Sequence, residues 1–289
     1  MSTLWQTIQY KMLRSGSKLN LLIGINIIVF LLINIPSTLE TLLFGSHSIT
    51  LFSDEYLRLS AYLPKLPLRF WTPLTYMFMH DGIFHILFNM LWLYWFGQIF
   101  EEYLGKKRTL GLYLLGGFTG AALFILSFNT FPFFTHANAA YYSSMVGASA
   151  SVMAIMVATA TLLPDYTISL IFIGPVKLKW LILAFIVIDF LGIVGPNAGG
   201  EIAHIGGGLM GYIYIKQVQR GNDWIGSMAN MFKPKSKLKV VSKNPSKNSS
   251  DFPRQEEIDL ILDKISQSGY DSLNKQEKEI LFRASNNEG

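Results

Sequence analysis

Long apolar segments separated by short polar ones make up most of this chain. Six such segments occur, at residues 20–36, 83–100, 110–128, 147–163, 180–194 and 201–216. An α-helix of about 20 apolar residues crosses a bilayer. The pattern therefore predicts an all-α membrane protein whose core is a bundle of six transmembrane helices.

The composition supports a membrane core and excludes some kinds of chemistry. The 289 residues are 51% hydrophobic and only 15% charged, whereas about a quarter of the residues in a soluble domain are charged. There is no cysteine, so disulfides, thiolate catalysis and Cys-based metal sites are excluded. The net charge of +5 does not indicate nucleic-acid binding, because the basic residues flank the apolar segments as topology signals do.

Lysine and arginine are distributed unevenly among the polar segments. The N-terminus, the 105–108 and 165–179 loops and the region after 216 are basic, whereas the 129–146 and 195–200 loops contain neither residue. The long 37–82 loop is an exception, with Arg58, Lys65 and Arg69. By the positive-inside rule, we expect both termini to be cytoplasmic. The absence of cysteine and of organelle-targeting features favours a bacterial cytoplasmic membrane.

The pattern also divides the chain into four parts. We expect an amphipathic cytoplasmic segment at 1–19, the six-span core at 20–220, a basic flexible linker at 221–253 and a small helical cytoplasmic module at 254–289. Gly269 separates two helical stripes in this module, and Asn274 with Glu277 fits a capping box. A cytoplasmic partner is expected for the module, whose function the sequence does not specify.

Four polar residues fall at one depth of the predicted bundle. Spans two, four and six enter from the external side, and His85, Asn89, Ser149 and His204 lie in their opening turns. At about 1.5 Å per residue, these side chains lie roughly 5–10 Å below the outer surface. Each one alone would be read as a polar contact between helices. Their shared depth instead favours a functional site.

The residue types fit nucleophilic catalysis. His204 would take the proton of the Ser149 hydroxyl, which is a weak nucleophile by itself. Asn89, His85 and the Ser149 backbone N–H would stabilise the resulting oxyanion. The two helices can approach closely because small residues recur along both, at positions 147, 151, 154 and 158 and at positions 200, 207, 208 and 211.

A third group that would orient His204 is not evident from the sequence. Asp189, near the outer end of the fifth span, and Glu201, three residues before His204, are the candidates. For both carboxylates we favour a structural or loop role.

Three short motifs resemble those of the rhomboid family of intramembrane serine proteases, over roughly residues 20–217. They are His80-Asp81-Gly82-Ile83-Phe84-His85-Ile86-Leu87-Phe88-Asn89, Gly147-Ala148-Ser149 and Ala203-His204-Ile205-Gly206-Gly207. The resemblance implies a Ser149–His204 dyad with His85 and Asn89 at the oxyanion. It also implies cleavage of membrane-anchored, single-span proteins near the external face. Finally, it implies a structural role for His80 and a capping role for Glu101 beside Gly105, at the cytoplasmic end of span two.

The chain departs from the family pattern at three places. Ala150 follows the serine where the family usually has glycine, and Met153 stands where an aromatic residue often packs on the histidine. The Trp-Arg pair of the first external loop is replaced by Trp71-Thr72, with Arg69 nearby. No catalytic group is lost by these changes.

Other functions remain as alternatives. The main one is a catalytically inactive rhomboid-like protein that binds transmembrane helices. A transporter is disfavoured because no inverted repeat is evident. No cofactor and no metal are predicted, and a metal held by His80, His85 and His204 is a minor alternative. The expected partners are transmembrane protein substrates and the lipid bilayer.

Overall fold

The computed structural model describes residue 6 and residues 16–170, 173–231 and 255–285. The predicted amphipathic segment at 1–19 and the predicted linker at 221–253 therefore lie mostly outside the described residues. The chain forms two compact units, Met1–Lys233 and Pro234–Gly289, and each is considered by itself below.

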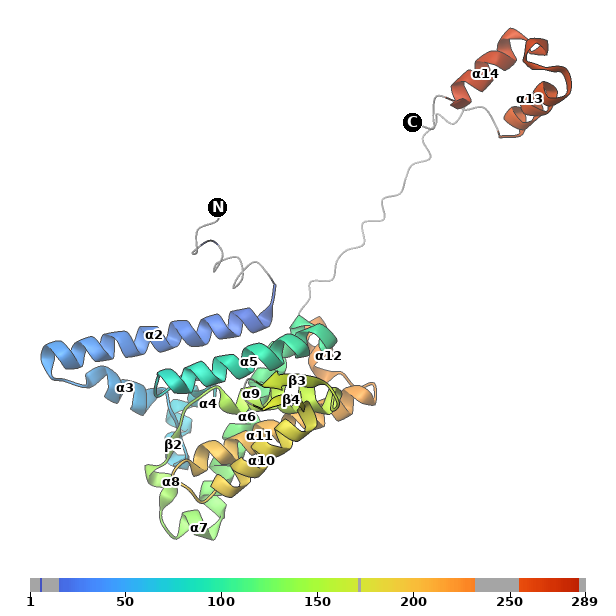
Figure 1. The fold of residues 1–289 in the computed structure, drawn as a ribbon. Helices are drawn as coiled ribbons and strands as arrows, with labels where there is room; N and C mark the ends of the chain where they lie inside the picture. Colours follow the sequence, from blue (N-terminus) through green and yellow to red (C-terminus); the bar gives the residue numbers. More distant parts are fainter. Residues whose placement is uncertain (1–5, 7–15, 171–172, 232–254, 286–289) are drawn as a thin grey trace. The chain divides into compact units, whose positions relative to one another are not determined.

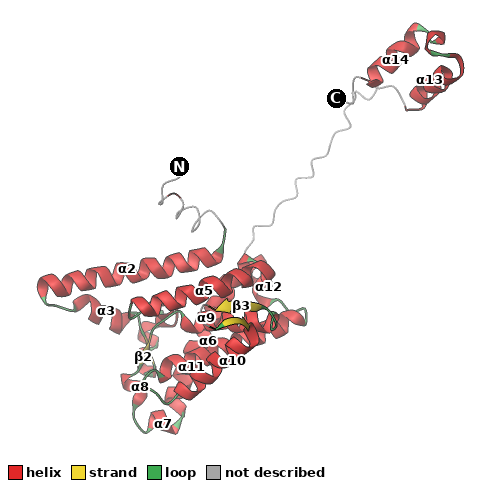
Figure 2. Ribbon diagram, viewed as in Figure 1, coloured by secondary structure: helices red, strands yellow, loops and turns green. Residues whose placement is uncertain are grey.

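The first unit is built mainly of helices (Figures 1 and 2). Its six main helices are α2 (Lys18–Phe44), α5 (Ile83–Leu104), α6 (Lys106–Thr130), α9 (Ser149–Leu162), α10 (Leu178–Gly192) and α11 (Ala198–Gln219). Each one overlaps one of the six predicted apolar segments. Three of them, α2, α5 and α6, are long and apolar enough to cross a membrane, and α9 is a shorter apolar helix. The protein is thus a helical, multi-pass membrane protein, while the count of six spans stays a prediction.

Helix α2 is longer than predicted, because it does not end at Pro36. It continues through the proline to Phe44 and stops where Gly45 adopts the left-handed conformation, with φ of 62°. A proline removes one backbone hydrogen bond and can be accommodated when the turns on both sides are intact. The left-handed glycine, which carries no Cβ penalty, is the actual stop signal.

The predicted external loop at 37–82 contains several short elements. They are α3 (Ser48–Tyr56), β1 (Leu59–Ser60), η2 (Leu63–Lys65), η3 (Pro67–Arg69), α4 (Thr72–Thr75) and η4 (Tyr76–Phe78). β1 pairs antiparallel with β2 (Ser144–Met145), with Leu59 opposite Met145. Two-residue strands carry no sequence periodicity, so this link between distant loops was not predicted.

Two further connections contain regular structure. The loop between α6 and α9 holds α7 (Pro132–Thr135) and α8 (Ala139–Tyr142) before β2. The loop between α9 and α10 forms a hairpin of β3 (Thr167–Leu170) and β4 (Gly174–Lys177). Lys177 and Lys179 each contact Asp165 in that loop, at 3.0 and 2.8 Å.

The centre of the first unit is α9, packed against α6 and α11. Glycines allow these backbones to touch: a Cβ at Gly207 of α11 would overlap the carbonyl oxygen of Ala150. A Cβ at Gly211, one turn further along, would overlap the carbonyl oxygen of Ala154. On α6, a Cβ at Gly120 would lie 2.6 Å from the Ala150 Cβ. Small residues of α9 and α11 thus form the predicted close contact, and Gly120 adds α6 to it.

The core extends beyond the boundary predicted at 220. Helix α12 (Trp224–Met231) follows α11, and the buried Ile225 packs against α6 at Gly111. Arg108 and Asp223 form an ion pair at 2.6 Å on the same side. Asp223 and Ile225 therefore belong to the core, although they fall in the predicted linker. Composition alone does not indicate the side-chain contacts that hold them there.

The second unit contains α13 (Gln255–Ser268), η5 (Tyr270–Ser272) and α14 (Lys275–Ser285). The predicted capping box is confirmed. The backbone N–H of Asn274 donates to Glu277 Oε2 at 2.8 Å, and the backbone N–H of Glu277 donates to Asn274 Oδ1 at 2.9 Å. Lys264 of α13 reaches Glu277 at 2.9 Å and so joins the two helices.

Candidate functional site

A cavity of about 1120 Å³ opens among α5, α6, α9, α10, α11 and the loop before α9. All four predicted site residues line this cavity: His85, Asn89, Ser149 and His204. Many of the remaining lining residues are aromatic: Phe84, Phe88, Trp92, Phe124, Phe128, Phe133, Phe134, Tyr142 and Phe185. The cavity therefore combines a small polar group with a large apolar wall, which is typical of a binding site.

Ser149 is the first residue of α9, and its approach is shaped by Gly147. Gly147 has a φ of 124° and its N–H donates to the Tyr76 carbonyl at 2.9 Å. A Cβ there would lie 2.8 Å from His85 Nε2 and 3.4 Å from Ser149 Oγ, so glycine leaves room for the imidazole beside the hydroxyl. The backbone N–H of Ser149 lies in the first turn, where N–H groups have no partner within the helix.

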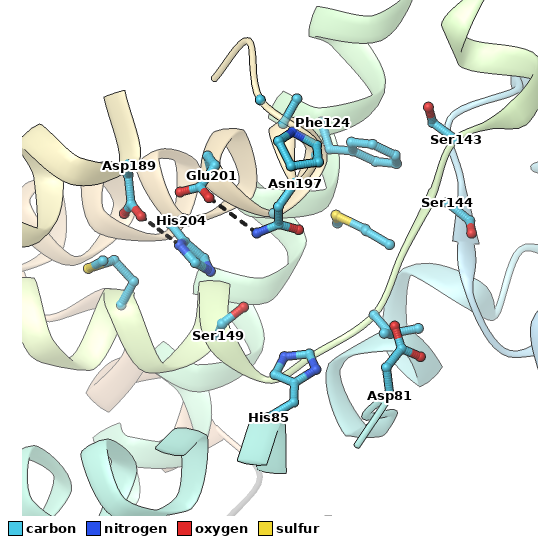
Figure 3. A pocket seen from close by; sticks show the side chains of 18 of the residues that line it. Asp81, His85, Phe124, Ser143, Ser144, Ser149, Asp189, Asn197, Glu201 and His204 are labelled. Carbon is cyan, nitrogen blue, oxygen red and sulfur yellow. Dashed lines mark hydrogen bonds and ion pairs between the residues drawn. The ribbon is translucent and has the colours of Figure 1, made fainter. Parts of the chain in front are cut away.

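His204 reaches the same place from α11. The close contact of Gly207 with Ala150 fixes the separation of α9 and α11 beside the site, because Ala150 follows Ser149 directly and Gly207 lies one turn after His204. The His204 ring and the Ser149 hydroxyl point toward one another (Figure 3). No hydrogen bond joins them among the residues that the structure describes, and such bonds are often long in enzymes without substrate.

Asp189 of α10 lies on the other side of His204. Its Oδ1 is 3.0 Å from His204 Nδ1, and the residue is only 5% exposed. The sequence favours a structural role for this carboxylate, yet the structure places it in direct contact with His204 (Figure 3). The signal was present in the sequence, because an acidic residue in an apolar span marks a functional position by default.

Glu201 lies close to the same pair. Its carboxylate accepts a hydrogen bond from Asn197 Nδ2 at 3.3 Å and packs against Gly192 of α10. Ligand atoms of Asp189, Glu201 and His204 all lie within 4.8 Å of one another. Among the described residues, this group could hold a metal ion, rather than the three histidines considered from the sequence.

His85 and Asn89 lie one turn apart on α5. Asn89 is 6% exposed, and its Nδ2 donates to the backbone carbonyl of His85 at 2.8 Å. A side-chain amide has two N–H donors, so one remains for a ligand in the cavity. The His85 ring packs edge-on against the buried His80 ring, with centroids 5.0 Å apart. His80 thus supports the residue beside Ser149.

The departures from the family pattern are accommodated locally. Ala150 is 1% exposed and fits because residue 120 of the facing helix is glycine. Met153 is buried and lines the cavity. Trp71 donates from Nε1 to the Tyr56 carbonyl at 2.8 Å, and the neighbouring Thr72 is buried.

Glu101 has a contact that the sequence did not indicate. It was expected to cap the cytoplasmic end of span two beside Gly105. The Glu101 carbonyl accepts the Gly105 N–H at that end, at 3.0 Å. The Glu101 carboxylate in addition accepts hydrogen bonds from the Ser17 hydroxyl and the Leu19 N–H, both at 2.8 Å. Glu101 therefore caps the beginning of α2 from the neighbouring helix.

Comparison with known proteins gives two family matches. Residues 67–220 match the Rhomboid domain family, and residues 248–287 match a family of unknown function (DUF6576). The chain is similar to "RHOMBOID-like protein 12, mitochondrial" from Arabidopsis thaliana, with 30% identity over 168 residues, which is 53% of this chain and 48% of that protein.

It is also similar to "Presenilin-associated rhomboid-like protein, mitochondrial" from Mus musculus, with 30% identity over 146 residues, which is 48% of this chain and 35% of the relative. The human protein of the same name is 27% identical over 141 residues, again 48% and 35% of the two chains. The chain thus spans about half or less of the length of the curated relatives it matches. The Rhomboid match covers all the cavity-lining residues except Arg58 and more than half of the sequence, and the chain belongs to the rhomboid family.

Proposed function

We propose that this protein is an intramembrane serine endopeptidase that hydrolyses peptide bonds of single-span membrane proteins near the external face. The observation that carries the proposal is the arrangement of Ser149 and His204, which face one another across two helices whose backbones touch at Gly207 and Ala150. If Ser149 and His204 formed only a packing contact between helices, the open cavity and the hydrogen-bond donors beside them would have no role.

The first step transfers the Ser149 proton. His204 Nε2 accepts the hydroxyl proton while Oγ attacks the carbonyl carbon of the scissile bond. The carbonyl oxygen becomes an oxyanion, and three groups support it: the Ser149 backbone N–H, the His85 ring and the free N–H of Asn89. The beginning of α9 adds a positive helix end at the same point.

The second half of the reaction releases the products. His204 gives its proton to the leaving amine nitrogen, the C–N bond breaks, and an acyl-enzyme on Ser149 remains. Water then attacks the acyl carbon with His204 as the base, and the Ser149 hydroxyl is restored as the new carboxylate leaves. Every proton that Ser149 gives up is thus returned.

The cavity supports a transmembrane segment as the substrate. Its volume of about 1120 Å³ and its aromatic wall suit an apolar chain that has locally unwound, since a protease must reach extended backbone. In this proposal the protein lies in a cell membrane with both termini on the cytoplasmic side. The beginnings of α5, α9 and α11 then face the external side. Cleavage would then occur near the external surface, where water enters.

The test is cleavage of a single-span reporter by the purified protein in liposomes. Ser149→Ala and His204→Ala should each reduce the rate to the background of empty liposomes. The matched control is Ser144→Ala, because Ser144 also lines the cavity but lies on β2. A second control is Ser151→Ala, since Ser151 lies on α9 itself, is 1% exposed and has no hydrogen-bond partner for its Oγ among the described residues.

Two outcomes would contradict the proposal. Cleavage that survives both Ser149→Ala and His204→Ala would exclude the dyad. A folded wild type that cleaves none of several reporters, yet captures transmembrane helices in the bilayer, would favour the inactive helix-binding alternative.

A further inference from the structure

Asp189 is the one acidic residue of α10, and it is buried. Most residues of this helix are large and apolar, and those around Asp189, such as Ile188 and Phe190, are 64% and 68% exposed on the outer face. Asp189 itself is 5% exposed and turns inward. A carboxylate in a membrane protein is expensive to bury without a partner or a function, so its contact with His204 needs a specific explanation.

The contact fixes the position of one proton. An ionised carboxylate can only accept hydrogen bonds, so the His204 Nδ1 that lies 3.0 Å from Asp189 Oδ1 must carry the hydrogen. A neutral imidazole has one N–H, and Nε2 is then left with its lone pair. Nε2 is the nitrogen that is free to face Ser149 (Figure 3), which is the arrangement that a general base requires.

On the basis of the proposed proteolysis, we propose that Asp189 is a positioning residue that holds His204 in its base-competent tautomer, so that the site works as a Ser149–His204–Asp189 triad. Asp189 does not take part in proton transfer. The proton moves from Ser149 Oγ to Nε2 and on to the leaving amine, while the Nδ1–H stays on the ring. The carboxylate stabilises the imidazolium that exists between those two transfers.

Glu201 is the neighbouring carboxylate and has a different set of contacts. It accepts a hydrogen bond from Asn197, packs on Gly192 and also lies beside the Asp189 carboxyl group. No hydrogen bond from Glu201 to His204 is present among the described residues. Glu201→Gln therefore tests whether an effect depends on the Nδ1 contact itself or on the carboxylate cluster as a whole.

The kinetic test compares Asp189→Asn with Glu201→Gln in liposomes. Asp189→Asn keeps the volume and removes the charge, and we expect kcat to fall by about 10- to 100-fold with KM changed less than about threefold. Glu201→Gln should lower kcat much less than Asp189→Asn does, because it retains the Asp189–His204 contact. If Asp189 served only folding, the isosteric Asp189→Asn variant would keep the kcat of the wild type. A kcat for Asp189→Asn within threefold of wild type, or an equal loss in Glu201→Gln, would overturn the assignment.

The second test does not depend on turnover. In protein labelled with ¹⁵N-histidine, the His204 resonances are identified by their absence in His204→Gln. Wild type should show a proton on Nδ1, shifted strongly downfield, and an unprotonated Nε2; Asp189→Asn should lose this signature. A His204 proton found on Nε2 in the wild type would overturn the inference.

The two tests separate this inference from the proposed function. A wild type that cleaves no reporter but shows the Nδ1 proton would exclude proteolysis, while the control of the His204 tautomer by Asp189 would stand. Cleavage that is lost on treatment with EDTA and restored by Zn²⁺ would mean that the cluster of Asp189, Glu201 and His204 holds an ion. The hydrogen-bond assignment would then be wrong.

Discussion

Helices α9 and α10 are both apolar, but they occupy different environments. Of the fourteen residues of α9, eleven are buried, whereas only three of the fifteen residues of α10 are buried. α9 consists mostly of small and medium residues, and α10 is rich in leucine, isoleucine and phenylalanine. Hydropathy alone therefore does not distinguish the central helix from the peripheral one. Residue size does, because only small residues allow the backbones of neighbouring helices to touch.

The same comparison explains where the polar site residues are held. Ser149 lies on the helix that the protein surrounds, and its position is set by backbone contacts. Asp189 lies on α10, where only three residues are buried, and its position is set by its side-chain contact with His204. Perturbing α9 should thus affect folding, and perturbing α10 at Asp189 should affect the chemistry.

The largest effect is expected where α9 and α11 touch. Gly207→Ala would place a Cβ against the Ala150 carbonyl, so the two backbones must separate, and we expect a loss of about 4 kcal/mol or more in the free energy of unfolding. The control is Gly208→Ala, whose Cβ would meet the Val157 side chain at 3.2 Å. Unfolding in mixed micelles with increasing dodecyl sulfate measures both. Equal stability of the two variants would show that this close contact does not hold the helices together.

Truncation of a large side chain to alanine should cost more stability on α9 than on α10, because α9 is the more buried helix. Ile155→Ala on α9 removes a side chain that is 0% exposed and should cost about 3 kcal/mol. Leu191→Ala on α10 removes one that is 72% exposed and should change stability by less than about 0.5 kcal/mol. The same micelle titration applies, and similar costs for the two would mean that a further chain covers α10.

Replacing alanine with the larger valine compares the same two helices by a smaller change in volume. Ala154 is fully buried, and Gly116 of α6 faces its Cβ. Ala154→Val should cost about 2 kcal/mol through overpacking, whereas Ala184→Val, at an exposed position of α10, should have almost no effect. A tolerated Ala154→Val would indicate that α6 can move away from α9.

The smallest effect is expected at the loop that joins α9 to α10. The Lys179 ammonium, and then that of Lys177, hold the pKa of Asp165 at about 2. Because this value lies below that of the unfolded chain, about 3.9, the stabilisation is present above about pH 4 and is lost as the pH falls through 2. The difference in melting temperature between wild type and Asp165→Asn should be small and should shrink between pH 5 and pH 2.5. A constant difference would contradict the ion pairs.

The sequence predicted the positions of the main helices, because an apolar segment has few other ways to satisfy its backbone in a membrane. The sequence also predicted one common membrane depth for His85, Asn89, Ser149 and His204, and the structure places all four at one cavity. Their catalytic roles stay predictions. What the sequence did not predict depends on contacts between distant residues: the β1–β2 pair, the packing of Ile225 on α6 and the Asp189–His204 hydrogen bond.

The cap that Glu101 forms on α2 has a consequence for how this protein can vary. The buried residues of α2 are Leu19, Leu22, Gly24 and Asn26, all in its first third, and the Rhomboid match begins only at residue 67. A single carboxylate on α5 and a short patch of contacts therefore attach a helix that lies outside the shared domain. At the other end of α2, the Glu40 carboxylate accepts hydrogen bonds from the Ser48 and Ile49 N–H groups and so holds the beginning of α3. Between these two polar attachments α2 has only to be apolar, so mutations can accumulate there without reaching the cavity.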